Sequence, residues 1–424
     1  MALEVFSNCI MYLSLLSVAA FLVLLARRYF SREPGSSMMT DVNIVPDFFS
    51  AVRKIGALFL WNRILLFTVV YLFVSVINNK KLGFLQSFKD IWFKWDSNGY
   101  LRIAENWYVT TGDEKFDIAL YPMYPLLVKA ANYIIHNYFL SGVFVSNLFL
   151  FIGLVYLYKL VSMEFNQEDT AFDSTKYLLF FPFSFFFSIV YTESVFFTLT
   201  VLTIYFIRRK KWHLGGLFGL FASFTRNQGL LLLIPIFIEL VSEIPWKEYL
   251  AAGNLRLIFR KLCLVVSVSL LVPCGTALYL LTNKLTYGDW FKFLSFQDEN
   301  WHQRFGFFAK NIKDFVYFIA SPEIRLSLGI FTPNLVIFFL CMALLILTVR
   351  KLRLSYLAYT LAYVLVSFSP TWLLSGPRYI AGMFTMYVML ALAIRKASSK
   401  KLAEGIFCVL LIFYAVLFTL NGVY

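Results

Sequence analysis

The chain has 424 residues, of which 60% are hydrophobic, 19% aromatic and 15% charged. A soluble domain of this length needs far more polar side chains to cover its core, so this composition excludes a soluble globular protein. The net charge of +14 does not indicate nucleic-acid binding, because the basic residues form short clusters between apolar segments. Length, composition and charge together predict a multi-pass integral membrane protein.

Helices that cross a bilayer need about 20 mostly apolar residues. From the N-terminus, the apolar segments that meet or approach this length are 8–26, 57–77, 139–158, 177–190, 191–207, 213–226, 229–241, 262–281, 328–348, 355–369, 379–394 and 404–421. We therefore expect an all-α, polytopic helical bundle of about 12 passes, which forms one membrane domain over residues 1–424. No basic stretch precedes the first apolar segment, so we expect residues 1–26 to be a retained helix rather than a signal peptide.

The basic residues predict the orientation of these passes. If the first pass runs from outside to inside, most Lys and Arg fall in inside loops, as the positive-inside rule requires. These inside clusters are Arg27, Arg28, Arg32, Arg53 and Lys54; the run 208–211; Lys247, Arg256, Arg260 and Lys261; Arg350, Lys351 and Arg353; and Arg395, Lys396, Lys400 and Lys401. The segment 213–241 is either one long helix or a hairpin that turns near Arg226. Only the hairpin keeps the later clusters inside, so we expect the hairpin.

Two long segments, 78–138 and 282–327, fall outside the membrane on this scheme, and both mix aromatic with charged residues. Trp and Tyr favour the headgroup level of a bilayer. We therefore expect short amphipathic helices in these lumenal loops, which lie on the outer leaflet and form one wall of a groove. One such helix is expected at 97–106, with Ser97 or Asp96 as its N-cap.

Four ionisable residues mark the same outer face. Asp96 lies in the first outer segment, whereas Glu193, Arg226 and Arg378 lie in short outside turns. Charged groups beside a bilayer are costly, so these positions favour a functional or paired role. The sequence of the outer segments shows no convincing cluster of metal ligands, so we expect neither a metal site nor a cofactor.

A series of motifs follows the same order along the chain. They are Trp95-Asp96, Tyr121-Pro122-x-Tyr124-Pro125, the Phe-rich run 181–194, Thr225-Arg226-Asn227-Gln228-Gly229, Tyr287-Gly288-Asp289 and Gly376-Pro377-Arg378-Tyr379. Over roughly residues 57–395, this series resembles the PIG-V-type mannosyltransferases, which add the second mannose during assembly of the glycosylphosphatidylinositol (GPI) anchor. The resemblance implies a GT-C fold with a catalytic Asp in the first lumenal loop, which is Asp96 here.

The same resemblance implies substrates, a location and partners. The donor substrate would be dolichyl-phosphate-mannose, the acceptor a GPI-precursor glycolipid, and the product an α-1,6-linked mannose. The enzyme would lie in the endoplasmic reticulum membrane with a lumenal active site, and it would work with a small membrane partner subunit.

The residues support such a transfer independently of the resemblance. The anomeric carbon of a lipid-phosphate sugar is already activated, so one general base is enough for a single displacement with inversion, whereas glycoside hydrolysis uses two carboxylates. Asp96 is the predicted base. The structural alternative for Asp96 is a helix N-cap, or an ion pair with Lys94 or Arg102.

Candidate binding residues accompany the predicted base. Arg378 and Arg226 are candidates for the donor phosphate, because a guanidinium grips phosphate oxygens with paired hydrogen bonds and stays charged near lipid. The alternative for both is snorkelling at the interface. Glu193 either binds sugar hydroxyls or pairs with one of these arginines, and we favour the pairing. Trp95 and Tyr124 are candidates for stacking on a sugar, and the alternative, which explains most such aromatics, is membrane anchoring. The remaining candidates are Asn227 for a sugar contact or, preferably, a helix cap, and Gln297 and His302 for the acceptor.

Two other functions stay open at this point. A related GT-C enzyme with a protein or bacterial lipid acceptor has the same features. A lipid or solute transporter is compatible with about 12 passes and interrupted helices. Against a transporter, the sequence contains no two-half repeat, and its ionisable residues cluster at one face rather than at mid-membrane.

Overall fold

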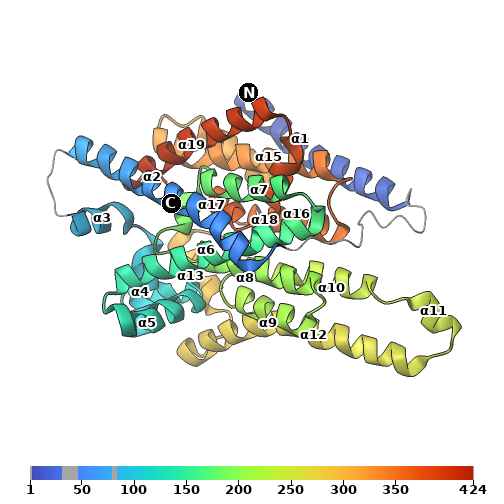
Figure 1. The fold of residues 1–424 in the computed structure, drawn as a ribbon. Helices are drawn as coiled ribbons and strands as arrows, with labels where there is room; N and C mark the ends of the chain where they lie inside the picture. The colour runs from blue at the N-terminus through green and yellow to red at the C-terminus, as the bar shows by residue number, and fades with distance from the viewer. Residues whose placement is uncertain (1, 31–45, 79–83, 424) are drawn as a thin grey trace.

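The computed structural model describes residues 2–30, 46–78 and 84–423. Within these ranges the chain is helical, with turns and one isolated β-bridge between Phe305 and Pro370, so the all-α prediction is confirmed (Figure 1). Arg32, the side chain of Lys247 and the 79–83 part of the first outer segment lie outside the described residues.

The helices follow one another with mostly short connections. In the first half of the chain they are α1 (Ala2–Phe30), α2 (Phe48–Asn78), α3 (Phe84–Trp92), α4 (Asp96–Asn106), η1 (Asp113–Ala119), α5 (Met123–Ile135), α6 (Tyr138–Phe165), α7 (Glu168–Phe180), η2 (Ser184–Phe187), α8 (Glu193–Arg208) and α9 (Trp212–Ser223). In the second half they are η3 (Asn227–Leu232), α10 (Leu233–Ser242), α11 (Trp246–Ala251), α12 (Leu255–Tyr287), α13 (Lys292–Trp301), α14 (Phe308–Ile319), η4 (Arg325–Phe331), α15 (Thr332–Thr348), α16 (Leu354–Ser367), α17 (Gly376–Ala381), α18 (Phe384–Ala393) and α19 (Ala397–Thr419).

Six helical segments of the described chain are long and apolar enough to cross a membrane. They are α1, α2, α6, α12, the continuous segment Arg325–Thr348 and α19. A further pair, Asp113–Ala119 and Met123–Ile135, is bent by 107° and would make a seventh span if counted as one. These segments support a multi-pass membrane protein. The expected 12 passes are not confirmed, because most of the other predicted passes correspond to shorter helices such as α8, α16 and α18.

The predicted pass at 177–190 is wrong as a single helix. Helix α7 ends at Phe180, the short η2 turn follows, and α8 begins only at Glu193. Pro182 stands at the break, and a proline removes a backbone donor and clashes with the preceding turn of a helix. The apolar stretch 177–207 therefore folds as the end of α7 and the helix α8, with a buried turn between them.

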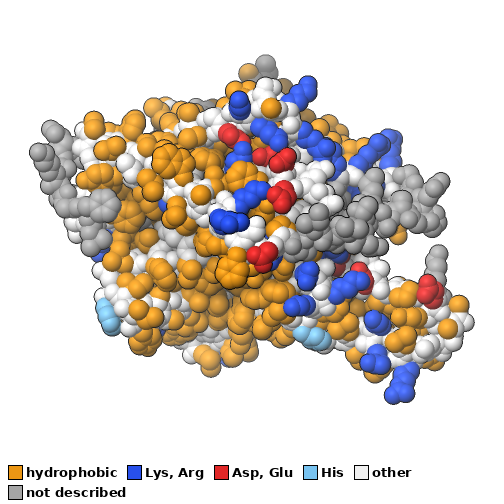
Figure 2. Space-filling model, viewed as in Figure 1, with side chains coloured by type: hydrophobic (Ala, Val, Ile, Leu, Met, Phe, Trp, Pro, Cys, Tyr) orange, Lys and Arg blue, Asp and Glu red, His pale blue; other side chains and the backbone are white. Residues whose placement is uncertain are grey.

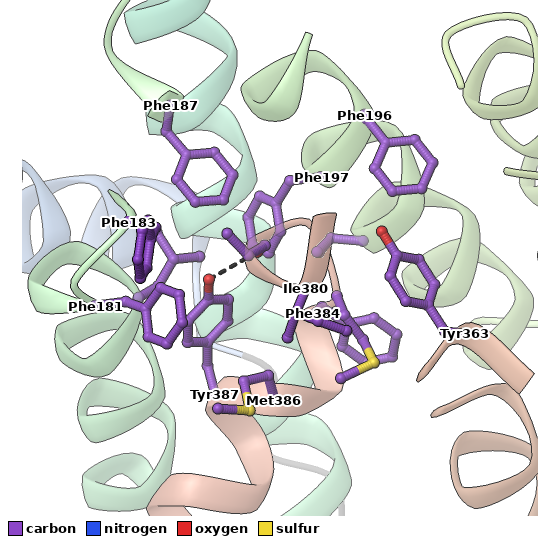
Figure 3. Packing of buried hydrophobic residues seen from close by; sticks show 14 of the residues in the cluster. Phe181, Phe183, Phe187, Phe196, Phe197, Tyr363, Ile380, Phe384, Met386 and Tyr387 are labelled. Carbon is purple, nitrogen blue, oxygen red and sulfur yellow. Dashed lines mark hydrogen bonds between the residues drawn. The ribbon is translucent and has the colours of Figure 1, made fainter. Parts of the chain in front are cut away.

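The buried turn between α7 and α8 packs into an aromatic core (Figure 3). The rings of Phe181 and Phe197 lie 5.8 and 6.4 Å from the ring of Tyr387 in α18. The Tyr387 hydroxyl donates to the Ala381 carbonyl at 2.7 Å, so its one polar group is satisfied inside the core. Close van der Waals packing of this kind holds helices together in lipid, where hydrophobic burial between helices contributes little.

Residues 213–241 form the expected hairpin. Arg208 Nη1, at the end of α8, lies 2.8 Å from Glu239 Oε2, near the end of α10. Lys210 Nζ likewise lies 2.6 Å from Glu243 Oε2. The chain therefore leaves this end through α9, turns at Arg226 and returns through η3 and α10. The hairpin prediction is confirmed, and Arg226 lies at the opposite end from Arg208.

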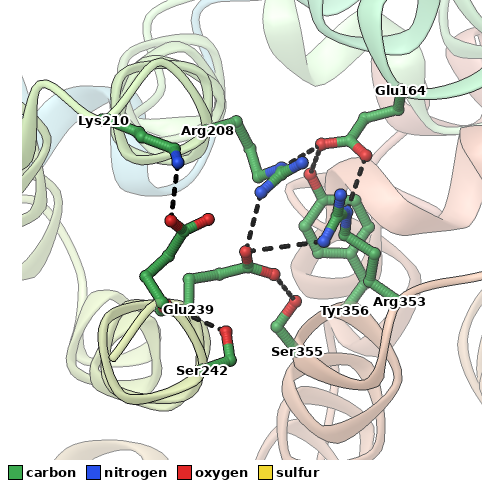
Figure 4. A network of polar contacts seen from close by, with 9 residues as sticks. Glu164, Arg208, Lys210, Glu239, Ser242, Arg353, Ser355 and Tyr356 are labelled. Carbon is green, nitrogen blue, oxygen red and sulfur yellow. Dashed lines mark hydrogen bonds and ion pairs between the residues drawn. The ribbon is translucent and has the colours of Figure 1, made fainter. Parts of the chain in front are cut away.

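A polar network closes the end of the bundle that carries Arg208 (Figure 4). Glu164 of α6 accepts from Arg208, from Arg353 Nε at 2.8 Å and from the Tyr356 hydroxyl at 2.9 Å. Arg208 and Arg353 come from two of the clusters that the sequence assigns to the inside, so the fold brings these clusters together. Charged side chains also gather toward the right of Figure 2, on the side where Figure 1 shows α11, and hydrophobic side chains dominate the left of that view.

Candidate active site

Four ionisable side chains meet at the other end of α8. Asp96 is the first residue of α4, Glu193 the first of α8 and Arg378 the third of α17, and Arg226 directly precedes η3. Because α8 rises 1.5 Å per residue, Glu193 and Arg208 are separated by about 22 Å along the helix. The group is therefore remote from the Glu164 network, as expected for two opposite ends of a membrane bundle.

The four groups form an alternating chain of charges. Arg378 Nη1 lies 2.8 Å from Asp96 Oδ2, and Arg378 Nε lies 3.1 Å from Glu193 Oε1. Arg226 Nη1 lies 2.6 Å from the same Glu193 oxygen. The order is thus Asp96, Arg378, Glu193, Arg226, with two positive and two negative formal charges. We call these four residues the charge quartet.

Burial distinguishes the members of the charge quartet. The Glu193 side chain is 0% exposed and each arginine side chain is 9% exposed, whereas the Asp96 side chain is 25% exposed. Glu193 therefore holds the two arginines from behind, as the favoured pairing predicts. Asp96 is the carboxylate of the quartet that a ligand can reach. The second Glu193 oxygen is buried and accepts no hydrogen bond from the described residues.

Aromatic rings surround the two guanidinium groups. The Tyr379 ring lies 5.4 Å from the Arg378 guanidinium and 5.1 Å from that of Arg226. The Tyr191 ring lies 5.1 Å from the Arg378 guanidinium. Cation–π contacts stabilise a buried cation and restrict the directions that it can take. The aromatic positions around the turns thus keep both arginines charged and aligned.

Two glycines bring the arginines into place. A Cβ atom on Gly376 would lie 2.3 Å from the Asn334 side-chain oxygen, so only glycine fits where α17 begins against α15. Pro377, next in the chain, suits the first turn of a helix because its missing N–H has no partner there. A Cβ atom on Gly229 would lie 2.5 Å from the Ala222 carbonyl oxygen, across the turn that carries Arg226.

The start of α4 positions Asp96. The helix begins at Asp96 rather than at Ser97, and Trp95 occupies the cap position with φ +52°. A positive φ is unfavourable for a bulky residue, and such strain of about 1–3 kcal/mol clusters at functional sites. The Tyr191 hydroxyl donates to the Lys94 carbonyl at 3.2 Å and ties this turn to the buried segment before α8.

Arg102, one of the alternative partners expected for Asp96, pairs with Asp117 instead. Arg102 donates from Nε and Nη2 to both carboxylate oxygens of Asp117, at 2.8 and 2.7 Å. The N-cap position of α4 is occupied by Trp95, whose side chain makes no capping hydrogen bond, and not by Asp96. The observed ion pair of Asp96 is with Arg378, which no local sequence pattern indicates.

A cavity of about 740 Å³ opens beside the charge quartet. Of the residues singled out from the sequence, it is lined by Trp95, Asp96, Arg226, Asn227, Gln297 and Arg378. Glu193 lies behind its wall. Burial raises the pKa of the Tyr100 hydroxyl, which also lines the cavity, so this group stays protonated. The cavity therefore unites most of the predicted site residues around one accessible carboxylate of the quartet.

Besides Glu193, two predicted binding residues do not line this cavity. Tyr124 is completely buried, and its hydroxyl contacts the Gly142 carbonyl at 3.0 Å and Ser146 Oγ at 2.9 Å. It thus joins α5 to α6. His302 lines a separate cavity of about 430 Å³, whose walls include Asp314 and Trp372. Both residues were proposed because they lie in aromatic motifs of the outer segments. The packing of the helices places neither of them in the cavity beside the charge quartet.

The outer segment 282–327 forms part of the cavity wall, as expected, but partly through residues that were not among the candidates. Asp298, Gln303 and Arg304 are among these residues, and Arg304 Nε lies 2.6 Å from Asp298 Oδ1. This stretch is fastened to a distant turn, where the Thr371 N–H donates to the Arg304 carbonyl at 2.8 Å. The mixture of charged and aromatic residues in 282–327 indicated that this segment lies at the site. Which of its side chains reach the cavity depends on the long-range contact with Thr371. No group of three or more metal-ligating side chains occurs among the described residues.

Comparisons with known proteins give one distant structural similarity. No protein-family model matches the sequence, and no curated protein sequence does. A similar solved structure is that of ArnT from Cupriavidus metallidurans bound to undecaprenyl phosphate, with 16% sequence identity and a TM-score of 0.48. The match covers 81% of this chain and 62% of ArnT, so the chain spans less than two thirds of that protein's length. This similarity is too distant to assign a function.

Proposed function

We propose that this protein is a GT-C-type glycosyltransferase that moves a sugar from a lipid-phosphate donor to an acceptor hydroxyl at the membrane face. One observation carries the proposal: an accessible carboxylate, Asp96, lies in a cavity beside two buried arginines, with Arg378 Nη1 at 2.8 Å from it. Six apolar helices of spanning length supply the membrane setting in which a lipid-linked substrate is found.

The charge quartet supplies the groups that such a transfer needs. Asp96 takes the proton of the acceptor hydroxyl while the acceptor oxygen attacks the anomeric carbon. The bond from that carbon to the phosphate oxygen breaks, and its electron pair leaves with the phosphate. Arg378 and Arg226 stabilise the charge that develops there, because preorganised cations in a dry site act strongly on a forming anion.

The other ionisable groups of the cavity fit the role of base less well. Asp298 is bound to Arg304 by an exposed ion pair and lies on the α13 side of the cavity. Tyr100 stays protonated because of its burial. A transporter is not favoured, because the charge quartet lies at one end of α8 rather than near its middle.

The motif series supports a finer proposal about the substrates. On that basis the donor is dolichyl-phosphate-mannose, the acceptor a GPI-precursor glycolipid, and the product carries a second, α-1,6-linked mannose. The site then faces the lumen of the endoplasmic reticulum, and a small membrane partner subunit assists. A protein or a bacterial lipid as acceptor is the competing proposal, because the charge quartet deals with the donor phosphate and the hydroxyl but not with the rest of the acceptor.

The proposal is tested by measuring sugar transfer by purified Asp96→Asn protein in lipid nanodiscs. Dolichyl-phosphate-mannose is supplied with GPI intermediates, a peptide or a bare lipid carrier in parallel reactions. Loss of the base should lower kcat by at least about 100-fold. The matched control is Asp90→Asn, which changes an exposed outer carboxylate that accepts from Gln86 Nε2 at 2.8 Å, and it should behave like the wild type. Undiminished turnover by folded Asp96→Asn protein contradicts the role of Asp96.

A further inference from the structure

We propose that Arg378 exchanges partners during the reaction: it holds Asp96 before the transfer and the departing lipid phosphate after it. This inference rests on the proposed function and adds a role for the contact between Asp96 and Arg378. It follows from the geometry of the charge quartet and from the movement of charge that the transfer requires.

The charge quartet carries two cations and two anions, so it is neutral before a substrate binds. A lipid-phosphate sugar is a phosphodiester with one negative charge, whereas the lipid phosphate that leaves is a monoester with about −1.5 to −2 at neutral pH. Asp96 becomes neutral when it takes the acceptor proton. About one negative charge therefore moves from Asp96 to the phosphate, and the total is unchanged.

Arg378 is the cation that can follow this charge. Its Nη1 donates a hydrogen bond to Asp96, whereas its Nε lies 3.1 Å from Glu193 Oε1 as an ion pair without hydrogen-bond geometry, so its two partners use different nitrogens. Once Asp96 is protonated, its attraction for Nη1 falls, while Glu193 still holds Nε. A guanidinium has five N–H donors in a rigid fork, so the released donors can bind phosphate without loss of the Glu193 contact. The ion pair of Arg226 is with Glu193, which takes no proton in the proposed transfer.

Ionised Asp96 competes with a phosphate for Arg378, and neutral Asp96 does not. A variant that makes position 96 permanently neutral should therefore bind the phosphate monoester more tightly than the wild type, even though it transfers no sugar. If Asp96 were a general base but Arg378 did not exchange partners, the variant would lose sugar transfer without binding the phosphate monoester more tightly through Arg378.

The experiment measures binding of a short-chain polyprenyl phosphate to the full chain in nanodiscs, with neither acceptor nor sugar donor present. We expect Asp96→Asn to lower the Kd by about tenfold, which corresponds to about 1.4 kcal/mol. The double variant Asp96→Asn with Arg378→Lys should lose this gain, because lysine cannot hold Glu193 and phosphate with one fork. Asp96→Asn with Arg226→Lys should keep most of it.

The matched control is Asp298→Asn, which removes the same charge from the same cavity but from an exposed partner of Arg304. It should change the Kd by less than twofold. Equal gains from Asp96→Asn and Asp298→Asn indicate general repulsion and overturn the partner exchange, as does a gain that survives Arg378→Lys. Wild-type protein that neither binds the polyprenyl phosphate nor transfers sugar contradicts the proposed function itself. Wild-type binding without the Asp96→Asn gain overturns the exchange alone.

Discussion

Arg378 Nη1 lies 2.8 Å from Asp96 Oδ2, although 282 residues separate the two in the sequence. Asp96 begins α4 in the first outer segment, and Arg378 lies in α17, near the C-terminal end of the chain. Because the helices between them must pack before the two side chains meet, the site forms only when the bundle is complete. The site and the bundle can therefore be tested separately, with variants that change one and leave the other intact.

The two arginines should contribute unequally to the transfer step. Arg378→Lys removes the fork that binds the departing phosphate, and loss of a charge-assisted hydrogen bond of about 1.5–3 kcal/mol should lower kcat by about tenfold or more, with a smaller effect on the donor KM. Arg226→Lys should lower kcat less, since its ion pair is with Glu193 rather than with the proton-accepting Asp96. Steady-state rates at varied donor and saturating acceptor measure both effects. Arg304→Lys, at an exposed position in the same cavity, serves as the control, and equal kcat values for all three variants contradict the assignment.

Gly376→Ala should disable the site through the backbone. The new Cβ atom would lie 2.3 Å from the Asn334 side-chain oxygen. Because Asn334 is buried and donates from Nδ2 to the Leu373 carbonyl at 2.7 Å, we expect α17 to shift and to carry Arg378 with it. We expect a loss of about 1–3 kcal/mol in stability and a fall in kcat of more than tenfold. Gly405→Ala in α19 is the matched control, because a Cβ atom there meets nothing within 4 Å. Denaturant unfolding and sugar-transfer rates are measured for both variants. Full activity of Gly376→Ala would show that the contact between Gly376 and Asn334 does not position Arg378.

Glu164→Gln should weaken the fold but not the chemistry. Glu164 is buried and binds Arg208, Arg353 and Tyr356, so its neutralisation leaves the two arginines with Glu239 as their one shared carboxylate among the described residues. Breaking a buried pair lowers the free energy of unfolding by about 3 kcal/mol or more. Glu243→Gln, in the more exposed pair with Lys210, should change it by less than about 1 kcal/mol. Denaturant unfolding in detergent gives both values, and kcat per folded molecule should stay unchanged in each variant.

Positions 90 and 210 should label from opposite sides of the membrane. Asp90 lies in the first outer segment, and Lys210 lies at the end of the bundle that carries the Glu164 network. In a cysteine-free background, Asp90→Cys should react with an impermeant maleimide added to sealed vesicles that expose the outer face. Lys210→Cys should react only after permeabilisation. Reaction of both positions from one side is incompatible with the proposed topology.

The sequence by itself determined the membrane class, most helices and the residue types of the site. Apolar runs fold as helices for local reasons, so α1, α2, α6, α12 and α19 lie at the expected positions. The predicted pass at 177–190 was wrong because Pro182 interrupts the run, and the expected 12 passes await a test such as the labelling above. Asp96, Arg226 and Arg378 were identified from the sequence because a charged group beside lipid is costly. Such positions therefore favour a functional role or an ion pair.

Only the tertiary structure decided which of these residues meet. It joined Asp96 to Arg378, placed Glu193 behind both arginines, and buried Tyr124 against Ser146. It also brought Asp298 and Arg304 to the cavity, which no local pattern indicated. Contacts across hundreds of residues depend on how helices pack in three dimensions, and a periodic pattern gives the face of one helix but not its neighbour.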